Sequence, residues 1–196
     1  MQPRVRMSVT HSTYSEIARK HNQIMKNQYL KLQDPKFDSQ DDNTYYDNLQ
    51  EKIEIESEIT YSFLIVVTFS AMCLESFIYD YAATFLTDSY VQNYIDKLDV
   101  ISKWVIVPRL IAGKEISRDK QAFQLLKETI KVRNDFVHSK SKAWNPSEFK
   151  KIAEKSSVLN YVNQAERCIL AIDKLAIELE NIHPDSLACF QLCVKR

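Results

Sequence analysis

The stretch ITYSFLIVVTFSAMCLESFIYDYA, residues 59–82, is the most informative part of this chain about its fold. Its apolar residues occupy every side of a helix, which is typical of a helix at the centre of a bundle. The most apolar part, residues 59–74, contains two serines and two threonines and ends at Glu75 after 16 residues. A membrane-spanning helix needs about 20 apolar residues, so we expect a buried core helix and no membrane association.

The composition favours helices over sheets. One glycine and five prolines in 196 residues provide few of the tight turns that β-hairpins need. The chain is 45% hydrophobic and 27% charged, which is typical of a globular protein and argues against a disordered one. We therefore predict an all-α, up-and-down helical bundle with long central helices and a C-terminal helical extension. It is expected to form a single domain over residues 1–196, with its core at about 45–181.

Turn residues and apolar periodicity divide the chain into elements. The segment KWVIVPRLIAGKEI, residues 103–116, contains Pro108 and Gly113, so we expect an irregular crossing segment there. Pro146 is expected to open a short turn. The predicted helices cover residues 12–32, 45–86, 88–98, 119–140 and 156–181.

Charge and cysteine content limit the classes of function. The chain has 26 basic and 26 acidic residues, so any contact with RNA must come from a local basic patch. Cys189 and Cys193 lie four residues apart, downstream of His183, but no second cysteine pair has metal-ligand spacing. We expect no metal and no cofactor. Residues 1–10 lack the apolar core of a signal peptide, which favours a cytoplasmic location.

The predicted helix 119–140 carries an arginine where its pattern calls for an apolar residue. At about 100° per residue, Arg133 falls near the centre of the apolar arc. Asn134 and His138, four residues apart, share one edge of that arc. Such departures from the binary pattern often mark functional sites. Arg133, Asn134 and His138 are therefore candidate residues of a functional or paired site.

Glu75 is the second departure from the pattern. It is the only charged residue between Glu58 and Asp80. Because an unpaired carboxylate in an apolar interior is costly, we expect Glu75 to contact Arg133, directly or through a network that includes Asn134.

These residues carry a resemblance to the HEPN superfamily. The run RNDFVH, residues 133–138, resembles the superfamily signature of an arginine, a polar residue, a short spacer and a histidine near a helix end. MCLESFIYDYA resembles its acid-bearing helix, and KWVIVPRLIAGK followed by RNDFVHSK is similar to bacterial members. The resemblance covers residues 69–140 and implies a HEPN-like bundle.

The resemblance implies a metal-independent RNA endonuclease that works as a homodimer, in bacterial defence or beside an antitoxin or other partner protein. RNA supplies its own nucleophile, the 2′-OH. His138 would act as general base or acid, and Arg133 would hold the scissile phosphate. Asn134 would orient the phosphate or His138. Lys140 would add a phosphate contact, and Glu75 would support the site.

Several alternatives stay open. Arg133 can serve mainly in a structural ion pair with Glu75, and a histidine at a helix end is often a capping or surface residue. Asp135 is expected to be solvated. His11, His21 and His183 are expected to be ordinary surface residues. Two tyrosine pairs can stack bases, although core packing or use in an interface is commoner; the pairs are Tyr45 with Tyr46, and Tyr79 with Tyr81. The alternative function is a non-catalytic HEPN module that dimerises and binds a nucleotide, RNA or a partner protein, and a third is a plain helical scaffold.

Overall fold

The computed structural model describes residues 10–38, 42–137, 157–184 and 186. Over these residues the chain is all-α, with six α-helices and no strand. The bounds are α1 Thr10–Lys31, η1 Pro35–Asp38, α2 Asp42–Phe85, α3 Asp88–Tyr90, η2 Val91–Ile95, α4 Val100–Ala112, α5 Gln121–Val137 and α7 Val158–Ile182.

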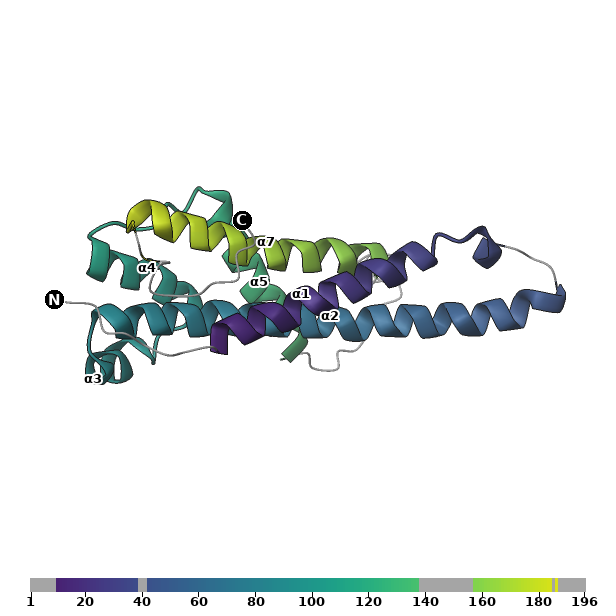
Figure 1. Ribbon diagram of the computed structural model, residues 1–196, viewed down its shortest axis with the longest axis horizontal. Helices are drawn as coiled ribbons and strands as arrows, with labels where there is room; N and C mark the ends of the chain where they lie inside the picture. The colour runs from purple at the N-terminus through teal and green to yellow at the C-terminus, as the bar shows by residue number, and fades with distance from the viewer. Residues whose placement is uncertain (1–9, 39–41, 138–156, 185, 187–196) are drawn as a thin grey trace, which may run out of the picture.

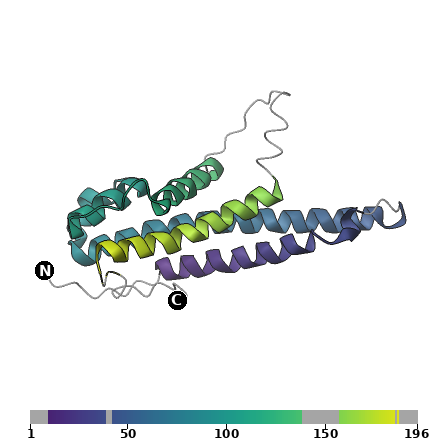
Figure 2. The same cartoon turned by 90° about the horizontal axis from the view of Figure 1, so that it is seen from above.

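The long helix α2 is the axis of the molecule, as the apolar stretch predicts. It runs unbroken for 44 residues, and no glycine or proline occurs in it. The helices α1, α2, α5 and α7 alternate in direction along the long axis, and in Figure 2 α1 lies on one side of α2 and α7, with α4 and α5 on the other. The second half of α2 forms one apolar cluster with α4, α5 and α7, and its first half forms another with α1 and the start of α7.

The helix α2 is also long and apolar enough to cross a membrane, judged by length and composition over Tyr45–Phe85. Of its most apolar window, 56% is buried inside the structure. The core helix of a soluble protein meets the same criterion, so the length and composition of α2 are weak evidence both for and against a membrane-spanning helix.

The expected irregular segment at 103–116 is wrong, because most of it belongs to the helix α4. Asp99 caps the helix start: its Oδ1 accepts from the Ser102 backbone N–H at 3.0 Å. Hydrogen bonds from Ser102 lower the pKa of Asp99. Pro108 lies inside α4 and is buried, so packing outweighs the backbone hydrogen bond that proline cannot donate. Gly113 ends the helix with φ 69°, in the left-handed region that favours glycine.

The predicted helix 88–98 is found as two short pieces. Thr87 caps α3 by accepting from the Tyr90 backbone N–H at 3.1 Å. The chain then widens into the π-helical turn η2, where Asp96 donates to the Val91 carbonyl at 2.8 Å. The other predicted helices agree with α1, α2, α5 and α7 to within a few residues wherever the structure describes them. Pro146 lies outside the described residues.

Candidate functional site

Helix α5 carries two of the predicted catalytic residues in its last turn. Its core-facing side is filled by Ala122, Phe123, Leu125, Leu126, Thr129 and Ile130. Arg133 continues the line of Ala122 and Thr129, at about 100° per residue, and is half-buried. Beyond Ile130, Val132 and Phe136 still pack against the second apolar cluster, and the Arg133 guanidinium lies between them on the core-facing side.

The predicted contact between Arg133 and Glu75 is wrong. The Glu75 carboxylate binds Lys103 instead, with 3.2 Å between Oε1 and Nζ. The Glu75 side chain is 45% exposed, so it is not the isolated interior acid that the sequence suggested. Among the described residues Arg133 makes no ion pair.

Lys103 is the buried charge that the sequence reasoning missed. Its side chain is 2% exposed, and its ammonium lies 3.2 Å from Glu75 and 3.5 Å from Asp96. These carboxylates come from α2 and from the residue after η2, so Lys103 of α4 joins its helix to α2 and to the segment that follows η2. Trp104 beside it donates from Nε1 to the Leu74 carbonyl at 3.2 Å. A signal existed in the sequence, because Lys103 directly precedes the apolar run WVIVP.

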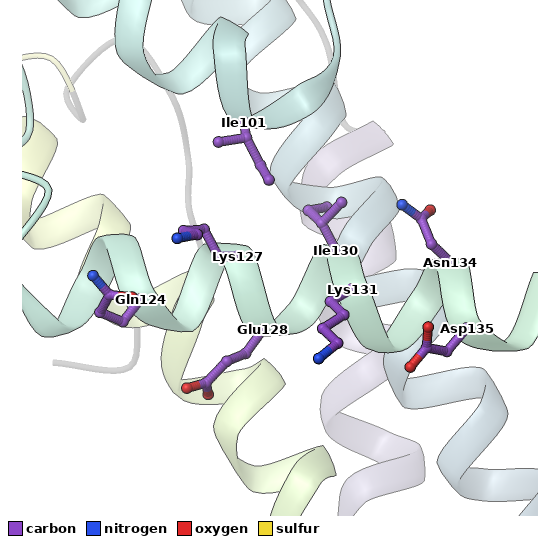
Figure 3. A pocket seen from close by; sticks show the side chains of 8 residues that line it. All are labelled: Ile101, Gln124, Lys127, Glu128, Ile130, Lys131, Asn134 and Asp135. Carbon is purple, nitrogen blue, oxygen red and sulfur yellow. The ribbon is translucent and has the colours of Figure 1, made fainter.

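Asn134 lines a pocket of about 460 Å³ between α4 and the outer side of α5. Figure 3 shows Ile101 of α4 facing Ile130 and Asn134 of α5 across this space. The lining residues are Ile101, Gln124, Lys127, Glu128, Ile130, Lys131, Asn134 and Asp135. Arg133 is not among them, since it lies about 100° further around the helix.

The charged side chains around this pocket are two lysines and two carboxylates, Glu128 and Asp135, and one of these carboxylates is bound elsewhere. Glu128 is engaged by Arg167 of α7, with 2.6 Å between the carboxylate and Nη2. Lys127 and Lys131 form no ion pair with any described carboxylate, and they lie four residues apart on one side of α5. Two ammonium groups and the Asn134 amide can together bind phosphate oxygens.

His138 and Lys140 lie outside the residues that the structure describes. The predicted Arg-x4-His pair is therefore described only as far as Val137, the last residue of α5. Cys189 and Cys193 also lie outside the described residues. Among the residues that are described, no group of three or more His, Cys, Asp or Glu side chains could hold a metal ion.

The expectation that the other histidines are ordinary surface residues is wrong. His11 is 1% exposed, and its Nδ1 lies 3.1 Å from the Asp80 carboxylate. His21 lies 3.4 Å from the Ser62 hydroxyl, and His183 lies 2.7 Å from the Tyr81 hydroxyl. All three bind side chains of α2. They attach α1 and the end of α7 to the central helix. This role cannot be predicted from the sequence without knowing which helices are neighbours.

The tyrosine pairs divide between core and surface. Tyr81 is fully buried and Tyr79 is half-buried, so this pair packs rather than stacking on a base. Tyr45 and Tyr46 are exposed, with ring centroids 5.5 Å apart.

Comparison with known proteins adds no relative: no family model, curated protein or solved structure matches this chain.

Proposed function

We propose that this chain is a metal-independent endoribonuclease of HEPN type that cleaves RNA by attack of the 2′-OH on the neighbouring phosphate. The observation that carries the proposal is the pocket on α5, where the predicted site residue Asn134 lies beside Lys127 and Lys131. Arg133, one residue away, has a guanidinium without an ion pair among the described residues. An RNA backbone offers the phosphates that such a set of donors binds.

Each residue has a distinct role in the proposed reaction. His138, predicted to share a face with Asn134, takes the proton from the 2′-OH or gives one to the leaving 5′-oxygen. Arg133 stabilises the charge that develops on the phosphate oxygens. Asn134 orients the phosphate, and Lys140 adds a phosphate contact. Glu75 supports the site only indirectly, because it binds Lys103.

The proposed enzyme is a cytoplasmic homodimer, with the two Arg/His motifs on either side of one cleft. One side of α2 supports dimerisation, since it is incompletely covered and uncharged. This side, here called the α2 central face, consists of Tyr61, Ile65, Thr68, Met72, Ser76 and Tyr79. The charged residue at the edge of this face, Glu75, is bound to Lys103, so a second copy can bind the face without bringing unpaired like charges together. The defence or toxin–antitoxin setting follows from the HEPN resemblance.

The test is incubation of the purified protein with single-stranded RNA in excess EDTA. We expect cleavage products with 2′,3′-cyclic phosphate and 5′-hydroxyl ends, because the 2′-oxygen displaces the 5′-oxygen at phosphorus. Absence of cleavage, both with EDTA and with added divalent metal, would contradict the proposal.

The alternative is a non-catalytic HEPN module that dimerises and binds a nucleotide, RNA or a partner protein. The zero net charge favours it, because the chain as a whole does not attract a long polyanion. A protein that binds RNA in the pocket of α5 but leaves it intact would have this function.

A further inference from the structure

The first turns of α2 carry an exposed apolar stripe. Tyr46 is 78% exposed, Ile53 49%, Tyr45 44% and Leu49 38%. Residues three and four apart lie on one side of a helix, so these side chains form a continuous strip. We call it the α2 arm stripe. Four large apolar side chains on one exposed side exceed the scattered exposure that is normal for a surface.

The neighbouring elements cover mainly the opposite side of this part of α2. Ile55 and Ile59 are buried in the same apolar cluster as Met25 of α1. Lys36 of η1 holds Glu51, with 2.6 Å between Nζ and Oε2. Figure 1 shows that α2 extends well past the start of α7, so α7 does not reach the arm stripe.

The arm is strongly acidic. Residues 45–58 contain Asp47, Glu51, Glu54, Glu56 and Glu58 but only one basic residue, Lys52. Glu56 lies three residues after Ile53 and seven after Leu49, so it continues the line of the stripe. It is half-buried and makes no ion pair among the described residues. The strip therefore combines an apolar seam with a carboxylate at its end.

We propose that the α2 arm stripe docks a basic amphipathic helix of a partner protein. The spacing of Tyr46, Leu49, Ile53 and Glu56 is that of alternating a and d positions in a coiled-coil seam, which a second helix fits. Lysine or arginine beside the apolar residues of that helix would bind Glu56 and lie in the field of the other acids. The same acids repel RNA and anionic lipid surfaces, and in a second copy they would face acids.

The test measures binding of two synthetic helical peptides by fluorescence anisotropy. One has leucine at a and d and lysine at e and g, and the other has glutamate in place of lysine. We expect the full-length protein to bind the lysine peptide and not the glutamate peptide. Binding of the lysine peptide should be at least tenfold weaker at high salt than at low salt, because salt screens the charges. The variant Tyr46→Ser with Ile53→Ser keeps every charge and should weaken binding at least tenfold. Glu56→Gln should weaken it severalfold.

The matched control is Leu110→Ser on α4, since Leu110 is 49% exposed, as Ile53 is. It should bind the lysine peptide as the wild type does. Equal binding of both peptides, or unchanged binding by the doubly substituted arm, would overturn the proposal. Sedimentation that shows loss of self-association in the arm variant would assign the stripe to a second copy. Binding to phosphatidylglycerol vesicles that the arm variant loses would assign it to a membrane. Either result would also overturn the proposal.

Discussion

At the residue scale, the arrangement of charges depends on which side chain is desolvated. Lys103 is almost fully buried, whereas its partners Glu75 and Asp96 are 45% and 57% exposed. Water can still solvate the two carboxylates, but it has almost no access to the Lys103 side chain. The stability of this cluster is therefore governed by Lys103, although Glu75 is the residue that stands out in the sequence.

Replacing Lys103 by Met should leave the free energy of unfolding unchanged or raise it. Met fills a similar volume and carries no charge to desolvate. Replacing Glu75 by Gln together with Asp96 by Asn strands the ammonium and should cost about 2–3 kcal/mol. This is less than the roughly 3–5 kcal/mol of a fully buried pair. Glu75→Gln alone should cost about 1 kcal/mol because Asp96 remains. Urea denaturation measures the free energy of unfolding of the three variants and checks their ranking. A Glu75→Gln/Asp96→Asn double variant as stable as the wild type would contradict the argument.

The His138→Ala variant should lose RNA cleavage by about 10²–10⁴-fold while its helical content stays unchanged. Arg133→Ala should lose activity as well. The sequence alone predicts that Arg133→Ala also destabilises the fold, but Glu75 is bound to Lys103, so we expect near-wild-type stability. Arg109→Ala on α4, whose side chain is 72% exposed, is the control and should stay active. Cleavage by His138→Ala at the wild-type rate would refute the assignment.

Burial of Cys73 should make stability depend on alkaline pH. Burial raises the pKa of the Cys73 thiol from 9.0 to about 12. Between these values the unfolded chain loses the thiol proton and the folded chain keeps it, so the free energy of unfolding falls as pH rises. From pH 8 to pH 10 we expect a loss of about 1 kcal/mol from this group. Urea titrations should show a smaller loss in Cys73→Ala, and equal losses in the two proteins would contradict the argument.

At the element scale, helix α4 shows that capping and packing outweigh a proline. Asp99 caps its start, Gly113 ends it, and Trp104 and Val107 bury its inner side. The sequence between these caps contains Pro108, which is why residues 103–116 are predicted to be irregular. Because α4 is a helix, Lys103 is directed inward to Glu75, and Ile101 becomes one wall of the pocket on α5.

Gly113→Ala should lower the free energy of unfolding by about 1 kcal/mol. No atom lies within 4 Å of an added Cβ, so the whole cost comes from φ 69°. Gly113→Asn should cost less, because asparagine tolerates the left-handed region, and Gly113→Val should cost more. Thermal unfolding of the three variants provides the measurement. Equal stability of the Asn and Val variants would show that the backbone has shifted away from this conformation.

At the scale of the whole molecule, α2 is too long for the elements packed on it to cover it. The α2 central face and the arm stripe are both left on the surface, but they differ in charge. The central face is uncharged and suits a second copy, whereas the acidic arm suits a basic partner. The proposed dimer and the proposed partner can therefore occupy the same helix at different positions.

The chain should sediment as a homodimer at micromolar concentration, and Met72→Glu should convert it to a monomer of 22.9 kDa. In the dimer, the introduced carboxylate would face either the same carboxylate of the second copy or apolar residues, and both arrangements disfavour association. Leu159→Glu, at an exposed position on α7, is the control and should remain dimeric. A monomeric wild-type protein would contradict both the dimer and the shared cleft.

The all-α class, the long central helix and the approximate bounds of α1, α5 and α7 could be predicted from the sequence, whereas the structure showed that the central helix is unbroken. These features depend on local periodicity and on the near absence of glycine, and both can be read along the chain. The sequence also placed Arg133 on the core-facing side of α5, because that depends only on the helical repeat. Three features became known only from the packing of the helices: Glu75 binds Lys103, His11 is buried against Asp80, and Asn134 shares a pocket with two lysines. Those contacts join residues 28 to 69 positions apart, or depend on how α4 lies against α5. No local pattern encodes which of several equally apolar helices becomes a neighbour, since the packing of all the side chains together settles it.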